Sequence, residues 1–202
     1  MQKLTVTKAT DLSIYSNLKS WAMEALIEDV KQGKAWYEDA QEFCMQLSLK
    51  YGIAPYIVAA VVSCLSPNNK WERNKIDTIT VIEAFLNGLS ADDVKVCTYN
   101  ANKLKAFAVL NGALISEKSP KTHAFSMNVG LLSPSHITID KWHLRACVLT
   151  PSDGIMDCAE SCTIVQYRRI EKITAQLAKD FGMKGYELQA IIWVTIKRVW
   201  NR

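Results

Sequence analysis

Asp140 is a carboxylate in a position where it could take part in chemistry. It ends the segment 134–140, whose composition predicts extended backbone, and it precedes the segment 142–149, which has the apolar spacing of a helix. An aspartate before a helical run commonly caps the helix by accepting a hydrogen bond from a backbone amide. The pattern alone therefore favours a cap, and a chemical role for this carboxylate needs support from its surroundings.

Lys121 and the loop 66–69 are two further places where the residue types suggest chemistry. Lys121 and Thr122 open the predicted helix 121–129, nineteen residues before Asp140. Lysine is a nucleophile only when it is deprotonated, which requires a desolvated or electropositive pocket. A surface lysine near a helix start explains the same sequence. The loop, Ser66-Pro67-Asn68-Asn69, has the composition of a simple chain turn.

Almost every long segment has the apolar rhythm of a helix, so the sequence predicts an all-α protein. The strongly apolar segment 57–65 is predicted as a buried helix at the centre of the core. It opens near Pro55, and the helix before it ends at Gly52. The predicted helices cover residues 11–32, 34–51, 55–65, 71–86, 90–96, 100–111, 121–129, 142–149, 163–181 and 186–200.

Composition sets broad limits on the class of protein. The chain has 202 residues, 49% of them hydrophobic, which allows one domain or two small lobes. Its net charge of +4 permits a nucleic-acid partner without requiring one. The six cysteines lack paired C-x-x-C spacings, so we expect reduced thiols and no metal site. We expect a cytoplasmic protein, because the sequence shows neither a secretory signal nor an apolar run of membrane-spanning length.

Three motifs follow one another from about residue 54 onward. A buried helix is broken by a polar loop (Val62-Ser63-Cys64-Leu65-Ser66-Pro67-Asn68), a Lys121-Thr122 pair opens a helix, and an aspartate stands at a helix start (Ile139-Asp140-Lys141-Trp142-His143-Leu144-Arg145). Their order and spacing resemble the helix-hairpin-helix DNA glycosylase superfamily, the group of endonuclease III and its adenine- and alkylpurine-excising relatives. The resemblance covers roughly residues 54–200. It implies a single unit, 1–202, of two helical lobes with a cleft between them, one of about 54–133 and one of about 1–53 with 134–202.

The resemblance also implies a role for each matching residue. Asp140 would be catalytic, because cleaving an N-glycosidic bond builds positive charge on the sugar, and a nearby carboxylate stabilises that charge and can orient a water. Lys121 would be a second catalytic residue, a lyase nucleophile that forms a Schiff base with the sugar. Asn68 would fill the gap left by an everted base. The remaining candidates are Asn69, Lys118, Thr122 and Arg73 for DNA binding and Trp71, Trp142 and His143 for the base pocket.

The implied partner is double-stranded DNA with one everted base, bound by a monomer with no cofactor and no metal. Several of these residues also have a plain structural explanation: Trp71 could begin a core face, and His143 could be a buried, hydrogen-bonded histidine. The sequence departs from the family in two places. Segment 115–120 has no glycine where the family's hairpin approaches a phosphate, and no cysteine follows Cys162, so the four-cysteine iron-sulfur cluster of some members is missing.

Two other functions are compatible with the same fold. Phage-encoded relatives of the superfamily act in DNA hypermodification, attaching groups to a pyrimidine, and a protein of that kind would work in the host cytoplasm. The other alternative is a catalytically inactive DNA-binding or inhibitor module that keeps the architecture.

Overall fold

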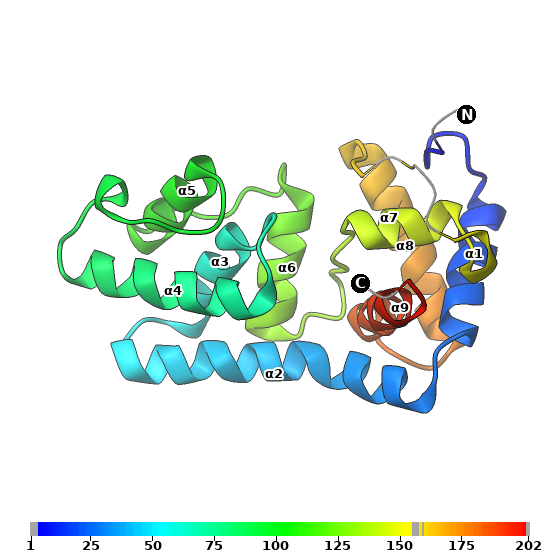
Figure 1. Ribbon diagram of the computed structural model, residues 1–202, viewed down its shortest axis with the longest axis horizontal. Coiled ribbons are helices and arrows are strands. Elements are labelled where there is room, and N and C mark those ends of the chain that lie inside the picture. Colours follow the sequence, from blue (N-terminus) through cyan, green and yellow to red (C-terminus); the bar gives the residue numbers. More distant parts are fainter. Residues whose placement is uncertain (1–3, 155–157, 159, 201–202) are drawn as a thin grey trace. The chain divides into compact units, whose positions relative to one another are not determined.

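The protein is all-α in the part of the chain that the computed structural model describes, residues 4–154, 158 and 160–200. The all-α prediction is therefore confirmed. Within these residues the β contacts amount to one isolated bridge between Leu4 and Cys158. The helices, drawn in Figure 1, are α1 (Asp11–Met23), α2 (Ile27–Tyr51), α3 (Pro55–Leu65), α4 (Trp71–Leu86), the 3₁₀ helix η1 (Ala91–Asp93), α5 (Asn100–Leu110), α6 (Pro120–Leu131), α7 (Lys141–Val148), the 3₁₀ helix η2 (Pro151–Asp153), α8 (Ile164–Asp180) and α9 (Gly185–Val199).

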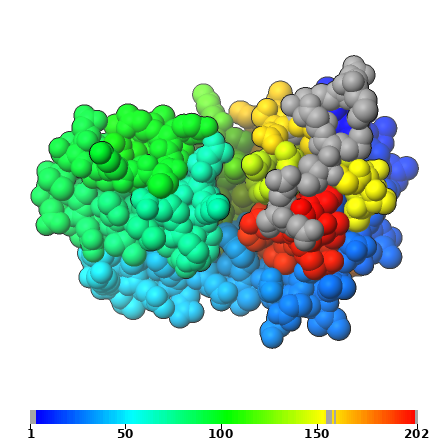
Figure 2. All heavy atoms as spheres, viewed as in Figure 1, coloured from blue at the N-terminus to red at the C-terminus, as the bar shows by residue number. Residues whose placement is uncertain are grey.

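The chain divides into two compact units. Unit 1 consists of Met1–Asp39 and Leu132–Arg202, and unit 2 consists of Ala40–Leu131. Figure 2 shows residues from both ends of the chain, blue and yellow to red, gathered in unit 1. The first boundary, between Asp39 and Ala40, lies inside α2, which continues without a break from Ile27 to Tyr51. The lobes that the resemblance implies divide at about residue 53 instead.

Helix α3 lies at the centre of unit 2, where it packs against α4, α5 and α6. From Val58 to Leu65 all of its residues except Ala60 are buried. Gly130 of α6 allows a close approach to this helix, because a Cβ there would lie 3.1 Å from the Cβ of Ala59. The prediction that this apolar segment forms a buried core helix is confirmed.

Unit 1 is built around the packing of α1 against α7, α8 and α9. Trp21 of α1 is fully buried, and its indole N–H donates a 2.7 Å hydrogen bond to the backbone oxygen of Leu149, just after α7. Its ring meets that of Trp200 edge-on, with ring centroids 5.1 Å apart. Burial of both tryptophans and a satisfied indole N–H fix the α1–α7 contact.

The break between the first two helices differs from the prediction. Helix α1 ends at Met23 rather than near residue 32, and α2 begins at Ile27 rather than near residue 34. Asp29 accepts a 2.9 Å hydrogen bond from the Leu26 amide at the start of α2, and Arg198 of α9 donates a 2.8 Å bond to the Glu24 carbonyl just past α1. The break lies at residues 24–26 because Asp29 and the distant Arg198 supply hydrogen-bond partners for the backbone groups left unpaired at these two helix ends.

Two other segments are less regular than the sequence suggests. Residues 90–96 form only the short η1, capped by Ser90 and Asp93, instead of a helix. The segment 134–140 forms no strand, although Asp140 itself has extended backbone angles (φ −95°, ψ −179°). Among the described residues no single helix is long and apolar enough to span a membrane, and α2 and α3 pass that test only together, as a pair bent by 119°.

Candidate functional site

Asp140 is the N-cap of α7. Its Oδ1 accepts a 2.8 Å hydrogen bond from the backbone N–H of His143, and the residue is partly exposed. The start of a helix carries a partial positive charge from its unpaired amides, which favours an anion at this place. The cap that the sequence pattern favours is therefore present, and it holds a carboxylate that reaches the surface at the positive end of a helix.

The backbone before Asp140 is fixed by Tyr167 of α8. The Tyr167 hydroxyl donates a 2.8 Å hydrogen bond to the Ile137 carbonyl and accepts a 3.0 Å bond from the Ile139 amide. Ile137 and Ile139 are both buried. Tyr167 thus holds the irregular backbone at residues 137–139, just before α7. The position of Asp140 is therefore set by α8 as well as by its own helix.

A buried tyrosine lies close enough to Asp140 to feel its charge. Tyr37 of α2 donates a 2.8 Å hydrogen bond to Oε1 of Gln189 on α9. Burial raises the pKa of Tyr37 far above its usual value, and the negative charge of Asp140 raises this pKa further, against a hydrogen bond with Thr138 that lowers it. Tyr37 therefore remains a neutral hydroxyl and adds no charge near Asp140.

His143 is a core residue and not a pocket residue, which corrects the pocket role expected for it. The side chain is 1% exposed, and its Nε2 lies 2.9 Å from Oγ1 of Thr174 on α8. Since the Thr174 hydroxyl donates to the Ile170 carbonyl, Nε2 must be the donor, and the buried Nδ1 has no hydrogen-bond partner. Burial lowers the pKa of His143 to about 3, so the ring is neutral.

Trp142, next to Asp140, packs in a cluster with basic side chains. The guanidinium carbon of Arg145 lies 4.7 Å from its ring centroid and Nζ of Lys141 lies 5.5 Å away. The Trp200 ring is 6.3 Å from it. Trp142 is partly buried, so a portion of this aromatic and basic cluster reaches the surface beside the α7 cap.

In unit 2, the loop between α3 and α4 has a strained tip at Asn68. This residue is exposed and has a φ of +57°, a left-handed conformation that asparagine tolerates better than most residues. Its amide donates a 2.6 Å hydrogen bond to the hydroxyl of Tyr99, whose residue is 63% exposed. Asn68 and Tyr99 therefore form a pair of polar and aromatic groups on the surface.

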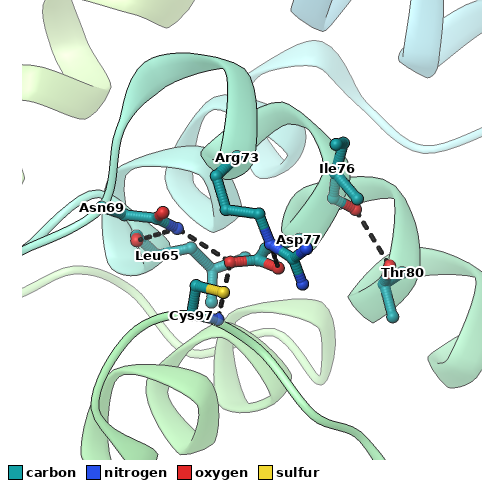
Figure 3. A network of polar contacts seen from close by, with 7 residues as sticks. All are labelled: Leu65, Asn69, Arg73, Ile76, Asp77, Thr80 and Cys97. Carbon is teal, nitrogen blue, oxygen red and sulfur yellow. Dashed lines mark hydrogen bonds and ion pairs between the residues drawn. The ribbon is translucent and has the colours of Figure 1, made fainter.

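Asn69 and Arg73 both bind the carboxylate of Asp77, as Figure 3 shows. Nδ2 of Asn69 lies 2.8 Å from Oδ2, and Nε of Arg73 lies 2.9 Å from Oδ1. The backbone amide of Cys97 also donates to Oδ2, at 2.9 Å. Asp77 is fully buried. The two predicted DNA-binding residues thus have a shared structural partner in this carboxylate.

Trp71 lies at the start of α4 and packs against Phe43 of α2. The centroid of the Trp71 ring is 5.9 Å from that of Phe43 and 5.8 Å from Nζ of Lys75. The residue is half-buried. This packing agrees with the plain structural explanation for Trp71, the start of a core face.

Lys118, Lys121 and Thr122 lie in and just after a turn at residues 116–119. The Ser119 amide donates to the Ser116 carbonyl at 2.9 Å, and the Lys118 amide donates to the Ser116 hydroxyl at 3.2 Å. Lys118 and Lys121 are exposed, Lys121 in the first turn of α6, while the Thr122 carbonyl accepts a 2.6 Å bond from Ser63 of α3. The turn at residues 116–119 is therefore held by the carbonyl and the hydroxyl of Ser116.

The predicted site residues belong to both units. Asp140, Trp142 and His143 are in unit 1, and the others are in unit 2. Two surface hollows of unit 1, about 550 and 350 Å³ in volume, contain none of the predicted site residues. No three His, Cys, Asp or Glu side chains gather into a possible metal site among residues 4–154, 158 and 160–200.

Asp77 and Tyr99, which contact the predicted residues Asn69, Arg73 and Asn68, are not among the predicted site residues. The spacing of Arg73 and Asp77, four residues apart on a helix, is a recognisable ion-pair signal. Nothing local marks Tyr99, because its contact with Asn68 joins residues 31 apart in the chain.

The fold and this geometry define an all-α protein with a partly exposed aspartate that caps a helix, and a comparison with protein families assigns the chain to one of them. A family model described as "Family of unknown function (DUF7178)" matches residues 1–199, so the chain belongs to this family. No curated protein and no solved structure matches it.

Proposed function

We propose that the chain is a DNA glycosylase-like enzyme with a helix-hairpin-helix glycosylase-like fold, which everts one base from duplex DNA and cleaves its N-glycosidic bond with Asp140. One observation carries the proposal: the Asp140 carboxylate caps α7, is partly exposed and stands at the positive end of a helix. A fixed anion of this kind stabilises the positive charge that develops on the sugar as the bond to the base breaks.

The surroundings of Asp140 support an electrostatic role for it. Tyr167 holds the preceding backbone and His143 supplies the cap hydrogen bond, so the carboxylate is fixed before any substrate arrives. A preorganised charge does not need to reorient during the reaction, which is what makes such groups effective. Tyr37 and His143 are neutral, so neither adds a charge to that of the Asp140 carboxylate.

Unit 2 supplies the proposed DNA contacts. Asn68 and Tyr99 form an exposed pair that joins an amide to an aromatic ring, groups suited to pair with or stack on bases. Lys118 and Lys121 are exposed at the turn before α6, where they suit phosphates. Lys121 as a lyase nucleophile is a separate part of the proposal, and borohydride trapping tests it, because only a Schiff base leaves a covalent adduct.

The test compares wild type with Asp140→Asn on a panel of duplexes carrying damaged and hypermodified bases. Asparagine caps a helix as well as aspartate does, so this change removes the charge and keeps the structure. We expect DNA binding to be retained and base release to fall by about 100-fold or more. Undiminished base release in Asp140→Asn would refute the mechanism.

Thr163→Ala is a matched control for helix capping. Thr163 caps α8 through a 3.2 Å bond from the Gln166 amide, and it lies outside the proposed site. Its loss should leave base release unchanged. Nucleoside analysis of the treated DNA separates excision from the hypermodification alternative, since excision leaves abasic sites and hypermodification leaves a new nucleoside.

A further inference from the structure

We infer that Asp77 is a positioning residue, which holds Asn68, Tyr99 and Arg73 as one preformed surface for nucleic acid on unit 2. We call these three residues the tip surface. The inference rests on the proposed function, because it takes DNA as the partner. It adds a recognition role for a buried carboxylate that touches no DNA itself.

Asp77 joins three separate pieces of chain. Its carboxylate accepts hydrogen bonds from the Asn69 side chain in the loop after α3, from Arg73 in the first turns of α4, and from the Cys97 amide in the segment before α5. The residue has no solvent exposure. Removing a buried carboxylate leaves its donors without partners, so the three pieces depend on this one group.

Two of the three donors, Asn69 and Cys97, lie next to or near a residue of the tip surface in the sequence. Asn69 directly follows Asn68, and Cys97 lies two residues before Tyr99. A second bond joins the same segments, because the Thr98 hydroxyl donates to the Pro67 carbonyl at 2.8 Å. The 2.6 Å bond from Asn68 to Tyr99 thus closes a short network that Asp77 anchors from inside.

Asp77 also orients Arg73. The Arg73 Nε binds Oδ1 at 2.9 Å, while 45% of the Arg73 side chain is exposed. A guanidinium has further N–H donors beyond Nε, and in a fixed orientation they suit the two-point binding of a phosphate oxygen pair. Arg73 therefore offers DNA a phosphate contact from α4.

Long-range electrostatics alone makes the opposite prediction for the sign of the effect of Asp77→Asn. Asp77→Asn removes one negative charge, so long-range electrostatics alone would strengthen the binding of an anionic duplex. If Asp77 positions the tip surface, the same substitution weakens binding, although the protein becomes more positive.

The experiment measures the dissociation constant of a duplex that carries one abasic-site analogue, over a series of salt concentrations. We expect Asp77→Asn to bind the duplex at least about 10-fold more weakly. The steepness of log Kd plotted against log [salt] should decrease by about one, as when one phosphate contact is lost. Arg73→Gln should show the same loss of slope, and the double variant should add little to it, because both changes remove one interaction.

Asp29→Asn is the matched control. Asp29 is also a buried carboxylate that binds the Nε of an arginine, Arg198, at 2.7 Å, but it lies in unit 1. We expect no weakening of DNA binding in this variant. Equal weakening in Asp29→Asn and Asp77→Asn would overturn the inference, as would unchanged or tighter binding by a folded Asp77→Asn.

If Asp77→Asn fails to fold, Arg73→Gln and Tyr99→Ala carry the test, since both residues are largely on the surface. Unchanged affinity and slope in both would overturn the inference. Its failure is distinct from that of the proposed function: wild type that binds and excises while Asp77→Asn binds equally well refutes only the inference, whereas wild type that binds no duplex refutes both.

Discussion

Gly33 provides a sharp test of the packing in unit 1. It lies inside α2, and a Cβ added to it would come 2.6 Å from both the backbone nitrogen and the Cα of Ile191 on α9. Helix propensity alone makes Gly33→Ala stabilising by about 1 kcal/mol, because glycine is a poor helix former. The contact with α9 opposes this gain.

The structure indicates which effect is larger. Carbon atoms in contact lie about 3.5–4.0 Å apart, so the added methyl group would be about 1 Å too close to backbone that cannot rotate away. Overpacking of this kind costs about 1–3 kcal/mol, and a clash with backbone belongs in the upper part of that range, about 2–3 kcal/mol. After the gain in propensity of about 1 kcal/mol, we expect Gly33→Ala to lower the free energy of unfolding by about 1–2 kcal/mol.

Chemical denaturation followed by tryptophan fluorescence measures this change, with Gly185→Ala as the control. A Cβ at Gly185 would meet Cδ1 of Ile137 at 2.5 Å and Cγ1 at 2.8 Å, but both belong to a side chain that can turn. We expect a smaller loss there, below about 1 kcal/mol. Stability of Gly33→Ala equal to or above that of wild type would refute the reasoning.

Two more outcomes follow from the site geometry. Because burial lowers the folded-state pKa of His143 to about 3 from an unfolded value of about 6.5, only the unfolded chain binds a proton between these values; stability should be complete above about pH 6.5 and fall by up to about 1.4 kcal/mol per pH unit below it. Urea unfolding at several pH values measures this, and a His143→Gln variant that keeps the full slope would contradict it. Asp140→Ala should cost about 1 kcal/mol through the lost cap, as should Thr163→Ala, whereas Asp140→Asn should cost little. Thermal unfolding compares the three, and equal losses in the two Asp140 variants would contradict the capping argument.

The sequence predicts elements that depend on neighbouring residues. The central helix of unit 2 begins at Pro55, and Gly52 before it has a φ of +67°, the left-handed conformation that ends a helix. Asp140 is a cap because an aspartate there meets the amide of the third helical residue. Local chemistry is sufficient in both cases.

Elements that depend on distant residues are not visible in the sequence. The predicted helices break at residue 33, yet Gly33 lies within α2, at a point where α9 approaches too closely for a side chain. The true break needs Arg198, which is 174 residues from the Glu24 carbonyl that it binds. The pocket role expected for His143 fails for the same reason, because Thr174 of α8 holds its ring in the core.

The division of the chain has a consequence for synthesis on the ribosome. All of unit 2 lies in one continuous stretch, Ala40–Leu131, so its residues are complete before residues 132–202 have been translated. Helix α1 emerges before unit 2, but its partners α7, α8 and α9 emerge after it. The apolar face of α1 that contains Trp21 must therefore stay unburied until α7, α8 and α9 have been translated, and during that time it is open to binding by a chaperone.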